Sequence, residues 1–284
     1  EFRRVLFREY YLIEVNPRVS RSSALASKAS GYPIARVTAK IALGMTLDEI
    51  EVAGGLASTE PSLDYIVAKF PRFPFDKFSD ASNILGTQMK ATGEVMGIGS
   101  TLTEGFLKSI RSLETGVCHL HLAKFDGMSR NNLMDYISEF RDDNMYAIAE
   151  LLRRGISVDD IHKVTMITEI FLEAFKAIVE MEKTLKDRVN DVKTLKAAKI
   201  LGFSDKEIAL LWNLSEVEIY QKRKANGIVP VFRMVDTLHT GKYIAYLYSS
   251  YTGKNESRLS DKKKIVVLGA GPIRIGQGVK FDYS

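Results

Sequence analysis

The sequence has few of the residues from which metal and redox sites are commonly built. Cys118 is the single cysteine among 284 residues, and there are four histidines. One cysteine excludes an intramolecular disulfide, which fits a reducing compartment, and a lone cysteine is more often a small buried hydrophobe than a nucleophile. His119 and His121 alternate as neighbours on one face of a strand would, but no second cluster of ligand residues accompanies them. We therefore expect no metal site at these histidines.

Long apolar runs are missing as well. No stretch approaches the roughly 20 apolar residues that a membrane-spanning helix needs, and no secretory signal is evident. We expect a cytoplasmic protein without membrane contact. The net charge of +5 can indicate nucleic-acid binding, but the basic residues are spread along the chain and mixed with acidic ones. A solvated surface is therefore the better interpretation of the charge.

Turn and cap signals divide the chain into five segments. Residues 1–8 (EFRRVLFR) have no pattern of their own, and we interpret them as a non-native leader. Residues 9–128 mix strand and helix patterns, and 129–228 carry almost only helix patterns. An extended, polar connector follows over 229–263, and 264–284 begin with a strand pattern and a glycine-rich turn. The predicted fold class is α+β, with an all-α domain large enough for its own core.

Cap residues give the sharpest local expectations. Thr46 with Glu49, and Thr101 with Glu104, have the spacing of capping boxes, so each pair predicts the start of a helix. In the second of these helices the apolar residues recur on one face. We expect strands over residues 10–15, 65–70, 94–98 and 264–268, and further helices over 24–30, 34–43, 146–154, 170–186, 197–201, 205–212 and 216–225.

One polar segment is a candidate for chemistry. Glu14 and Asn16 alternate on a predicted strand, so their side chains share one of its faces. A carboxylate and an amide oxygen on one face suit a hard cation such as Mg²⁺. Arg18 and Arg21 follow on a serine-rich loop, where guanidinium groups beside a metal-phosphate site can neutralise phosphoryl charge in the transition state. Taken alone, such spacing is more often a strand end with a polar loop than a metal site.

The wider string around these residues is distinctive, and it reads EVNPRVSRSSALASKASG from Glu14 onward. It resembles, residue by residue, the strand and loop at the nucleotide site in the first ATP-grasp half of carbamoyl phosphate synthetase large subunits. The resemblance continues through EPSLDYIVAKFPRFPFDKF and TQMKATGEVMGIG, and more loosely through AIAELLRRGISVDDIHKVT and LKAAKILGFSD. The final stretch, KIVVLGAGPIRIGQGVKFDYS, resembles the opening of the second synthetase half.

The resemblance implies an order of domains. Residues 9–128 would be the C-terminal part of the carboxyphosphate-forming ATP-grasp domain, and 129–228 an oligomerisation domain. Residues 229–263 would connect these to an α/β pre-ATP-grasp domain that opens the carbamoyl-phosphate-forming half at 264–284. Such a chain holds part of the enzyme, so we expect it to be inactive alone.

The resemblance also implies residue roles and partners. Glu14 and Asn16 would bind Mg²⁺ or Mn²⁺, with Glu14 also at the ATP, and Arg18 and Arg21 would act in catalysis. The family is a ligase that makes carbamoyl phosphate from bicarbonate, two ATP and glutamine-derived ammonia, for arginine and pyrimidine biosynthesis. The expected partners are a glutaminase small subunit and further copies of the chain, bound through the helical domain.

Two other interpretations are weaker. The glycines of GAGPIRIG lack the GxGxxG spacing, so we expect no dinucleotide cofactor. Residues 195–227 resemble a DNA-binding helix-turn-helix, with 216–225 as the recognition helix. That helix would begin with Glu216 and Glu218, whose charges would face DNA phosphates. Its basic residues gather at the C-terminal end, where positive charge interacts favourably with the helix dipole whether or not DNA is bound. We therefore expect no nucleic-acid partner.

Overall fold

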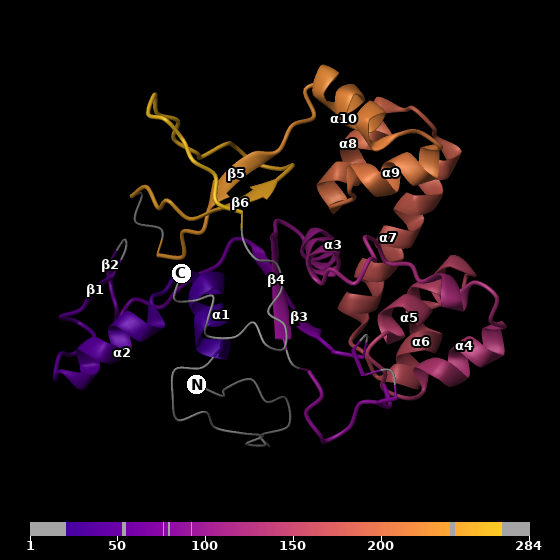
Figure 1. Ribbon diagram of the computed structural model, residues 1–284, viewed down its shortest axis with the longest axis horizontal. Coiled ribbons are helices and arrows are strands. Elements are labelled where there is room, and N and C mark those ends of the chain that lie inside the picture. Colours follow the sequence, from indigo (N-terminus) through magenta and orange to yellow (C-terminus); the bar gives the residue numbers. More distant parts are fainter. Residues whose placement is uncertain are drawn as a thin grey trace. The chain divides into compact units, whose positions relative to one another are not determined.

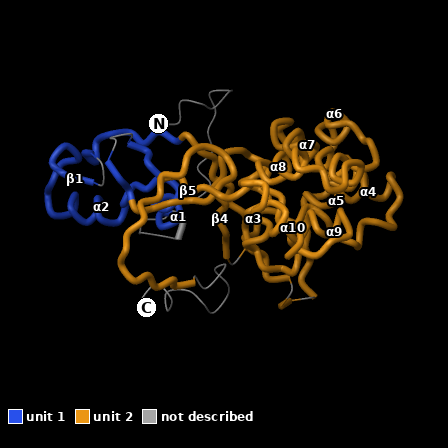
Figure 2. Tube along the Cα trace, turned by 90° about the horizontal axis from the view of Figure 1, so that it is seen from above, with its two compact units in different colours: residues 1–63, 235–244 blue, residues 64–234, 245–284 orange. Residues whose placement is uncertain are grey.

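The computed structural model describes residues 21–52, 55–75, 77–78, 80–91, 93–238 and 242–268. The chain forms two compact units, coloured separately in Figure 2. Unit 1 comprises Glu1–Leu63 and Val235–Ile244, and unit 2 comprises Asp64–Met234 and Ala245–Ser284. Each unit has its own hydrophobic core. The α+β class predicted from the sequence is confirmed.

The described part of unit 1 contains two short helices and a two-stranded ribbon. The helices α1 (Arg21–Ser30) and α2 (Ile34–Ala42) are separated by Gly31, whose φ of 66° lies in the left-handed region that glycine tolerates. The strands β1 (Glu51–Val52) and β2 (Gly55–Leu56) pair antiparallel. Four buried apolar residues form the core of this unit: Val37, Ile50, Val52 and Ala57.

The helix predicted to begin after Thr46 does not form. The backbone N–H and the hydroxyl of Thr46 both donate to Oε2 of Glu49, at 2.9 and 3.1 Å, so one half of the expected capping box is present. Residues 47–49 nevertheless form a turn, and Ile50 directly after them is fully buried in the unit 1 core. Burial of Ile50 next to β1 therefore outweighs the local preference for a helix.

In unit 2, a strand pair carries a helix on one face. The strands β3 (Ile66–Arg72) and β4 (Gly93–Gly99) form where strands were predicted, and the structure shows that they pair antiparallel. The helix α3 (Leu102–Ser112) follows β4 and packs against the pair (Figure 1). A Cβ atom at Gly97 would lie 2.4 Å from the carbonyl oxygen of Gly105. Glycine is therefore what allows the backbones of β4 and α3 to approach so closely.

The predicted start of α3 is confirmed. The side chain of Thr101 accepts a hydrogen bond from the backbone N–H of Glu104 at 3.2 Å. The Glu104 carboxylate in turn accepts from the backbone N–H of Ser100 at 2.7 Å, which ties the helix to the end of β4. The apolar face predicted for this helix is buried, at Phe106, Leu107, Ile110 and Leu113.

Helices make up most of the remainder of unit 2. Residues Ala123–Phe125 form a single turn of 3₁₀ helix. None of the helices in the described ranges combines the length and apolar character that crossing a bilayer requires. The α-helices after α3 in these ranges are α4 (Arg130–Ile137), α5 (Asn144–Arg153), α6 (Val158–Thr165), α7 (Glu169–Asp187), α8 (Val192–Leu201), α9 (Asp205–Trp212) and α10 (Glu216–Ala225).

The 19-residue helix α7 lies at the centre of this arrangement. It packs against α3, α5, α6, α8 and α9 (Figure 1). The ring of Phe175 on α7 lies 5.3 Å from the ring of Phe106 on α3, so the strand pair, α3 and the later helices share one continuous core. α8 begins earlier than predicted, because the side chain of Asp191 caps it by accepting from the N–H of Thr194 at 2.7 Å.

The extended connector predicted from the sequence contains a second strand pair of unit 2. The strands β5 (Val231–Met234) and β6 (Leu247–Ser250) are antiparallel neighbours. The buried strand predicted over residues 264–268 was wrong, because no strand is present there and Ile265 and Val267 are 91% and 89% exposed. A strand needs a hydrogen-bonded neighbour, and none of the described residues pairs with this segment.

Candidate functional site

The residues predicted for nucleotide chemistry are largely beyond the described ranges. Glu14, Asn16 and Arg18 lie outside the described residues. Arg21 is the first residue of α1, so that helix begins within the serine-rich loop. The grouping of these four side chains stays a prediction. Their donor types, a carboxylate and an amide oxygen, remain suited to a hard divalent cation.

His119, His121 and Cys118 have ordinary protein surroundings. Nε2 of the buried His119 lies 2.9 Å from Oε1 of Glu182, whereas His121 contacts the exposed Asp126 at 2.9 Å. Burial raises the pKa of Cys118, so its thiol stays protonated and is a poor nucleophile. Within the described ranges, no three His, Cys, Asp or Glu side chains are grouped closely enough to hold a metal ion.

Glu182 is the centre of a buried polar network rather than of a reaction site. Arg153 on α5 donates from Nε to Oε2 of Glu182 at 2.7 Å and from NH2 to Oε1 at 2.8 Å. Burial alone would raise the pKa of Glu182, but hydrogen bonds and positive charge from Arg153, together with the contact from His119, hold it at about 2. The network joins α5, α7 and the segment before the 3₁₀ turn.

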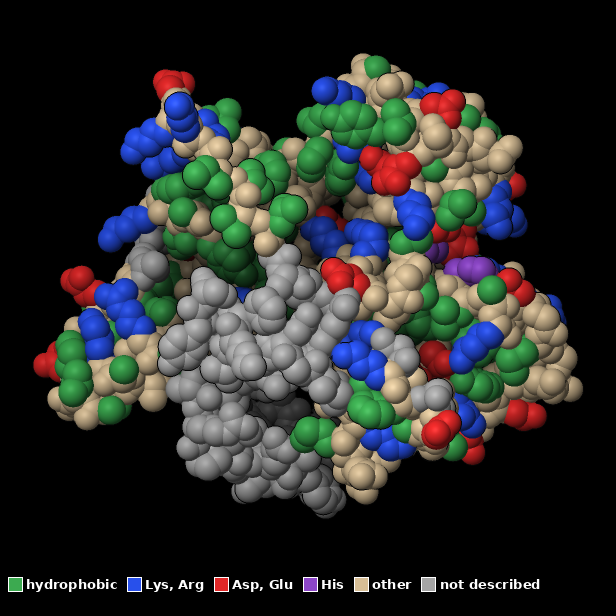
Figure 3. Space-filling view, viewed as in Figure 1, with side chains coloured by type: hydrophobic (Ala, Val, Ile, Leu, Met, Phe, Trp, Pro, Cys, Tyr) green, Lys and Arg blue, Asp and Glu red, His purple; other side chains and the backbone are tan. Residues whose placement is uncertain are grey.

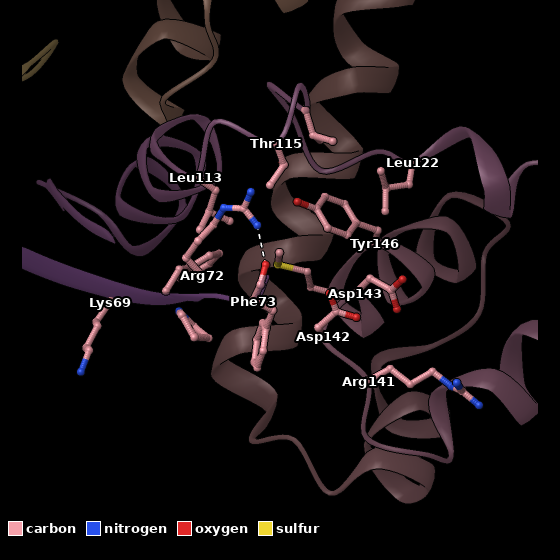
Figure 4. Close-up of a pocket in the computed structure, with 14 residues that line it drawn as sticks. Lys69, Arg72, Phe73, Leu113, Thr115, Leu122, Arg141, Asp142, Asp143 and Tyr146 are labelled. Carbon is pink, nitrogen blue, oxygen red and sulfur yellow. Dashed lines mark hydrogen bonds between the residues drawn. The ribbon is translucent and has the colours of Figure 1, made fainter. Parts of the chain in front are cut away.

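A cavity of about 510 Å³ opens in unit 2 where the ends of β3 and α3 meet the start of α5 (Figure 4). This volume falls in the range of small-molecule sites, roughly 300–1,000 Å³. Arg72, the last residue of β3, is 7% exposed and donates to the carbonyl oxygen of Phe73. The labelled residues of the cavity are Lys69, Arg72, Phe73, Leu113, Thr115, Leu122, Arg141, Asp142, Asp143 and Tyr146.

The two carboxylates of this cavity differ in their surroundings. Asp143 accepts from the hydroxyl of Tyr136 at 2.8 Å and pairs with Lys124. Asp142 accepts from the amide of Asn83 at 3.1 Å, and burial, followed by the charge of Asp143, raises its pKa. Among the described residues, the lining combines these carboxylates with apolar side chains such as Leu113 and Leu122. The arrangement therefore suits binding of a polar group between apolar walls.

No sequence motif singled out these cavity residues. A signal was present in FPRF, where Arg72 stands between apolar residues just after the strand predicted over 65–70. A charged residue inside an apolar pattern indicates a buried polar position. The presence of Arg72 and Asp142 in the lining of one cavity depends on how β3 meets α5, which no local pattern reveals.

Two segments of the chain match families of known proteins. Residues 5–50 match the family described as "Carbamoyl-phosphate synthase L chain, ATP binding domain". Residues 94–227 match the family described as "Carbamoyl-phosphate synthetase large chain, oligomerisation domain". The chain belongs to the carbamoyl-phosphate synthetase large-chain family. The family resemblance stated from the sequence motifs is thereby confirmed.

These matches assign large-chain domains to the described elements. The ATP-binding match contains Glu14, Asn16, Arg18 and Arg21, and it continues through α1 and α2. The oligomerisation match begins at β4 and runs to the end of α10. The cavity around Arg72 has one wall from β3, which lies between the two matches, and its other walls from the oligomerisation domain.

Proposed function

We propose that this chain acts within the large subunit of a glutamine-dependent carbamoyl phosphate synthetase. The observation that carries the proposal is the order of the two matches, an ATP-binding segment followed by an oligomerisation domain of the same large chain. The ATP-grasp half would use ATP to convert bicarbonate into carboxyphosphate, which ammonia converts into carbamate. A second ATP would phosphorylate carbamate in the other half. The product would serve arginine and pyrimidine biosynthesis in the cytoplasm.

In this proposal Glu14 and Asn16 hold a divalent cation, Mg²⁺ or Mn²⁺, beside ATP. When bound, such an ion offsets the negative charge of the phosphates and orients them for transfer. Glu14 supplies the negative charge that fixes the ion, and Asn16 supplies a neutral oxygen on the same strand face. Arg18 and Arg21 neutralise the oxygens of the transferring phosphoryl group, since a guanidinium presents paired donors in a fixed geometry.

We further propose two protein partners. A glutaminase small subunit would supply the ammonia, and a second copy of the chain would bind through the helical domain. The oligomerisation match supports the second proposal. Exposed apolar side chains near the start of α7 also support it, because patches of this kind mark protein interfaces. They are Met166, Ile170 and Phe171.

The reaction itself tests the proposal. A large subunit that includes this chain should form carbamoyl phosphate from ATP, bicarbonate and ammonia. Arg18→Met and Arg21→Met should each lower the rate by about a hundredfold, because each removes a charge aimed at the transition state. Arg36→Met, which removes an exposed charge on α2, is the matched control and should leave the rate unchanged. Absence of product with the unaltered subunit, or equal rates for Arg18→Met and the control, would refute the proposal.

We expect the 284-residue chain on its own to be inactive. The four assigned residues supply a metal-binding strand and two guanidinium groups, and ATP also needs groups that hold its base and ribose. ATP hydrolysis stimulated by bicarbonate, measured on the purified chain beside its Glu14→Ala variant, checks this expectation. A rate above that of the variant would show that the chain is active by itself.

A further inference from the structure

A small polar cavity of about 200 Å³ lies in unit 2 between α3, the end of α8 and strand β6. Lys and Arg side chains gather in the hollow between the β5–β6 pair and the helices α8–α10 (Figure 3). The cavity is separate from the Arg72 cavity, and neither family match assigns it a ligand. Its lining residues that matter here are Glu104, Lys108, Arg111, Lys199, Ser250 and Tyr251.

One cation of this cavity, Lys108, forms an ion pair with a carboxylate. Lys108 lies 2.9 Å from Oε1 of Glu104, one turn earlier on α3. The other oxygen of Glu104 accepts from the N–H of Ser100 at 2.7 Å and from the hydroxyl of Ser250 at 3.1 Å. Both oxygens of the Glu104 carboxylate are therefore engaged, and its single negative charge acts on Lys108 and, at longer range, on Arg111.

A second carboxylate serves two cations. Asp205 accepts from Nζ of Lys199 through one oxygen and from Nε of Arg223 through the other, each at 2.7 Å. The ring of Tyr251 lies 4.9 Å from Lys199 Nζ and 5.9 Å from the Arg223 guanidinium carbon, which adds a weak attraction for both. Among the described residues of this group, two positive charges share one negative charge, which leaves a net charge of +1.

Arg111 adds a positive charge beyond those that Glu104 and Asp205 balance, so the described groups at the cavity carry two more positive than negative charges. Its NH1 donates to the carbonyl oxygen of Gly202 at 2.9 Å, and no carboxylate among the described residues forms an ion pair with it. Burial lowers the pKa of Arg111, and it also lowers that of Lys199, so both sit where a positive charge is disfavoured. Since an arginine cannot be deprotonated in a protein, its charge calls for an anion.

We propose that this cavity binds a small, doubly charged oxyanion of the phosphate type. The two excess positive charges match a dianion, and the guanidinium, the ammonium group and the hydroxyls around the cavity donate hydrogen bonds to oxygen. The volume is below that of pockets for drug-sized ligands, roughly 300 Å³ and above, so the ligand is a free ion rather than a nucleotide. The bound ion joins α3, α8 and β6. The proposal does not depend on the ATP chemistry proposed above.

The test is calorimetric titration of the 284-residue chain with potassium phosphate, in a chloride buffer of constant ionic strength. We expect saturable binding with one ion per chain. Arg111→Gln should weaken it by about tenfold or more, because a charge-assisted hydrogen bond is lost while a donor to Gly202 is kept. Lys196→Gln, which removes an exposed charge from α8, should bind phosphate as the unaltered chain does.

Two further titrations test whether the cavity attracts negative charge and whether it prefers a doubly charged anion. Glu104→Gln removes a negative charge from the cavity wall and should tighten phosphate binding. Bicarbonate, which carries a single charge, should bind more weakly than phosphate. Circular dichroism checks that each variant is folded, and Lys199→Gln replaces Arg111→Gln if that variant unfolds. Absence of saturable heat, equal affinity for chloride and phosphate, or equal loss in Arg111→Gln and Lys196→Gln would each overturn the proposal.

Discussion

Glu182 is 5% exposed, yet it carries a negative charge because Arg153 donates two hydrogen bonds to its carboxylate. His119 contacts one of the same oxygens. A buried carboxylate without such partners would be protonated or would destabilise the fold. Folding and ionisation of Glu182 are therefore coupled, and the coupling has a defined direction with pH.

Acid should destabilise unit 2 through this residue. The pKa of Glu182 falls from its ordinary value of 4.5 to about 2 on folding. Its contribution to stability is thus complete above pH 4.5 and is lost as the pH falls toward 2, by roughly 3 kcal/mol in total. Urea unfolding across this interval should show the loss in the unaltered chain and in Glu180→Gln, an exposed control on the same helix. Equal pH dependence in Glu182→Gln would contradict the assignment.

Gly202 is fixed by two separate constraints. Its φ is 99°, and a Cβ atom there would lie 2.8 Å from the Cα atom of Glu104. Gly155, after α5, has a φ of 81° and open space around the same position. Alanine at Gly155 should therefore cost about 1 kcal/mol of unfolding free energy, from backbone strain alone. Alanine at Gly202 should cost at least about 1 kcal/mol more, because α8 must move away from α3. Equal costs in denaturant unfolding would show that the close approach is not maintained in solution.

At the scale of elements, α10 shows why a basic helix need not bind DNA. Lys222 donates to Oδ1 of Asn190 at 2.8 Å and Arg223 to Asp205 at 2.7 Å, so these side chains serve contacts within the domain. At the other end of the helix, Ser215 and Glu218 form a capping box. The two ends therefore have structural uses that account for their charges.

We predict that the chain forms no complex with duplex DNA. A gel-shift titration at low salt, where phosphate contacts are strongest, is the most permissive measurement. A retarded band that weakens steeply as salt rises, and that is lost in Lys224→Gln, would favour the helix-turn-helix hypothesis instead. Lys196→Gln on α8 is the matched control for loss of one surface charge.

Sequence patterns correctly predicted the features that depend only on residues close together in the chain. The cap at Thr101 and the apolar face of α3 are properties of neighbouring residues, and both were confirmed. The predictions of a helix after Thr46 and of a strand at residues 264–268 were wrong, because both elements depend on their surroundings. Burial of Ile50 prevents the helix, and the strand lacks a pairing neighbour among the described residues. The cavities could not be predicted, since they join side chains from elements far apart in sequence. The nucleotide residues came from family resemblance.

At the scale of the whole molecule, the domain boundary predicted near residue 129 falls inside one continuous hydrophobic core. The sequence indicated a separate helical domain from there to residue 228. In the structure, Phe106 on α3 packs against both Phe171 and Phe175 on α7, and the oligomerisation match also begins before α3. We infer that α3 and the helices after it form one cooperative unit.

Limited proteolysis can distinguish these boundaries. We predict that the protected core includes α3 and therefore begins before Leu102, because release of α3 would expose the apolar face it shares with α7. The ends of the surviving fragment can be read by mass spectrometry. A stable core that begins near Ser129, with α3 digested, would instead support the boundary drawn from the sequence.

The central proposal is that the strand predicted around Glu14 belongs to the nucleotide site of the first synthetase half. Glu14→Gln keeps the side-chain shape and removes the charge that would fix the metal ion. The most direct measurement compares two partial reactions of a large subunit that includes this chain, with Glu60→Gln as an exposed control in the same unit. We predict that Glu14→Gln lowers bicarbonate-dependent ATP hydrolysis by about a hundredfold and leaves ATP synthesis from ADP and carbamoyl phosphate unchanged. Loss of ATP synthesis with hydrolysis spared would place this strand in the other half and contradict the account.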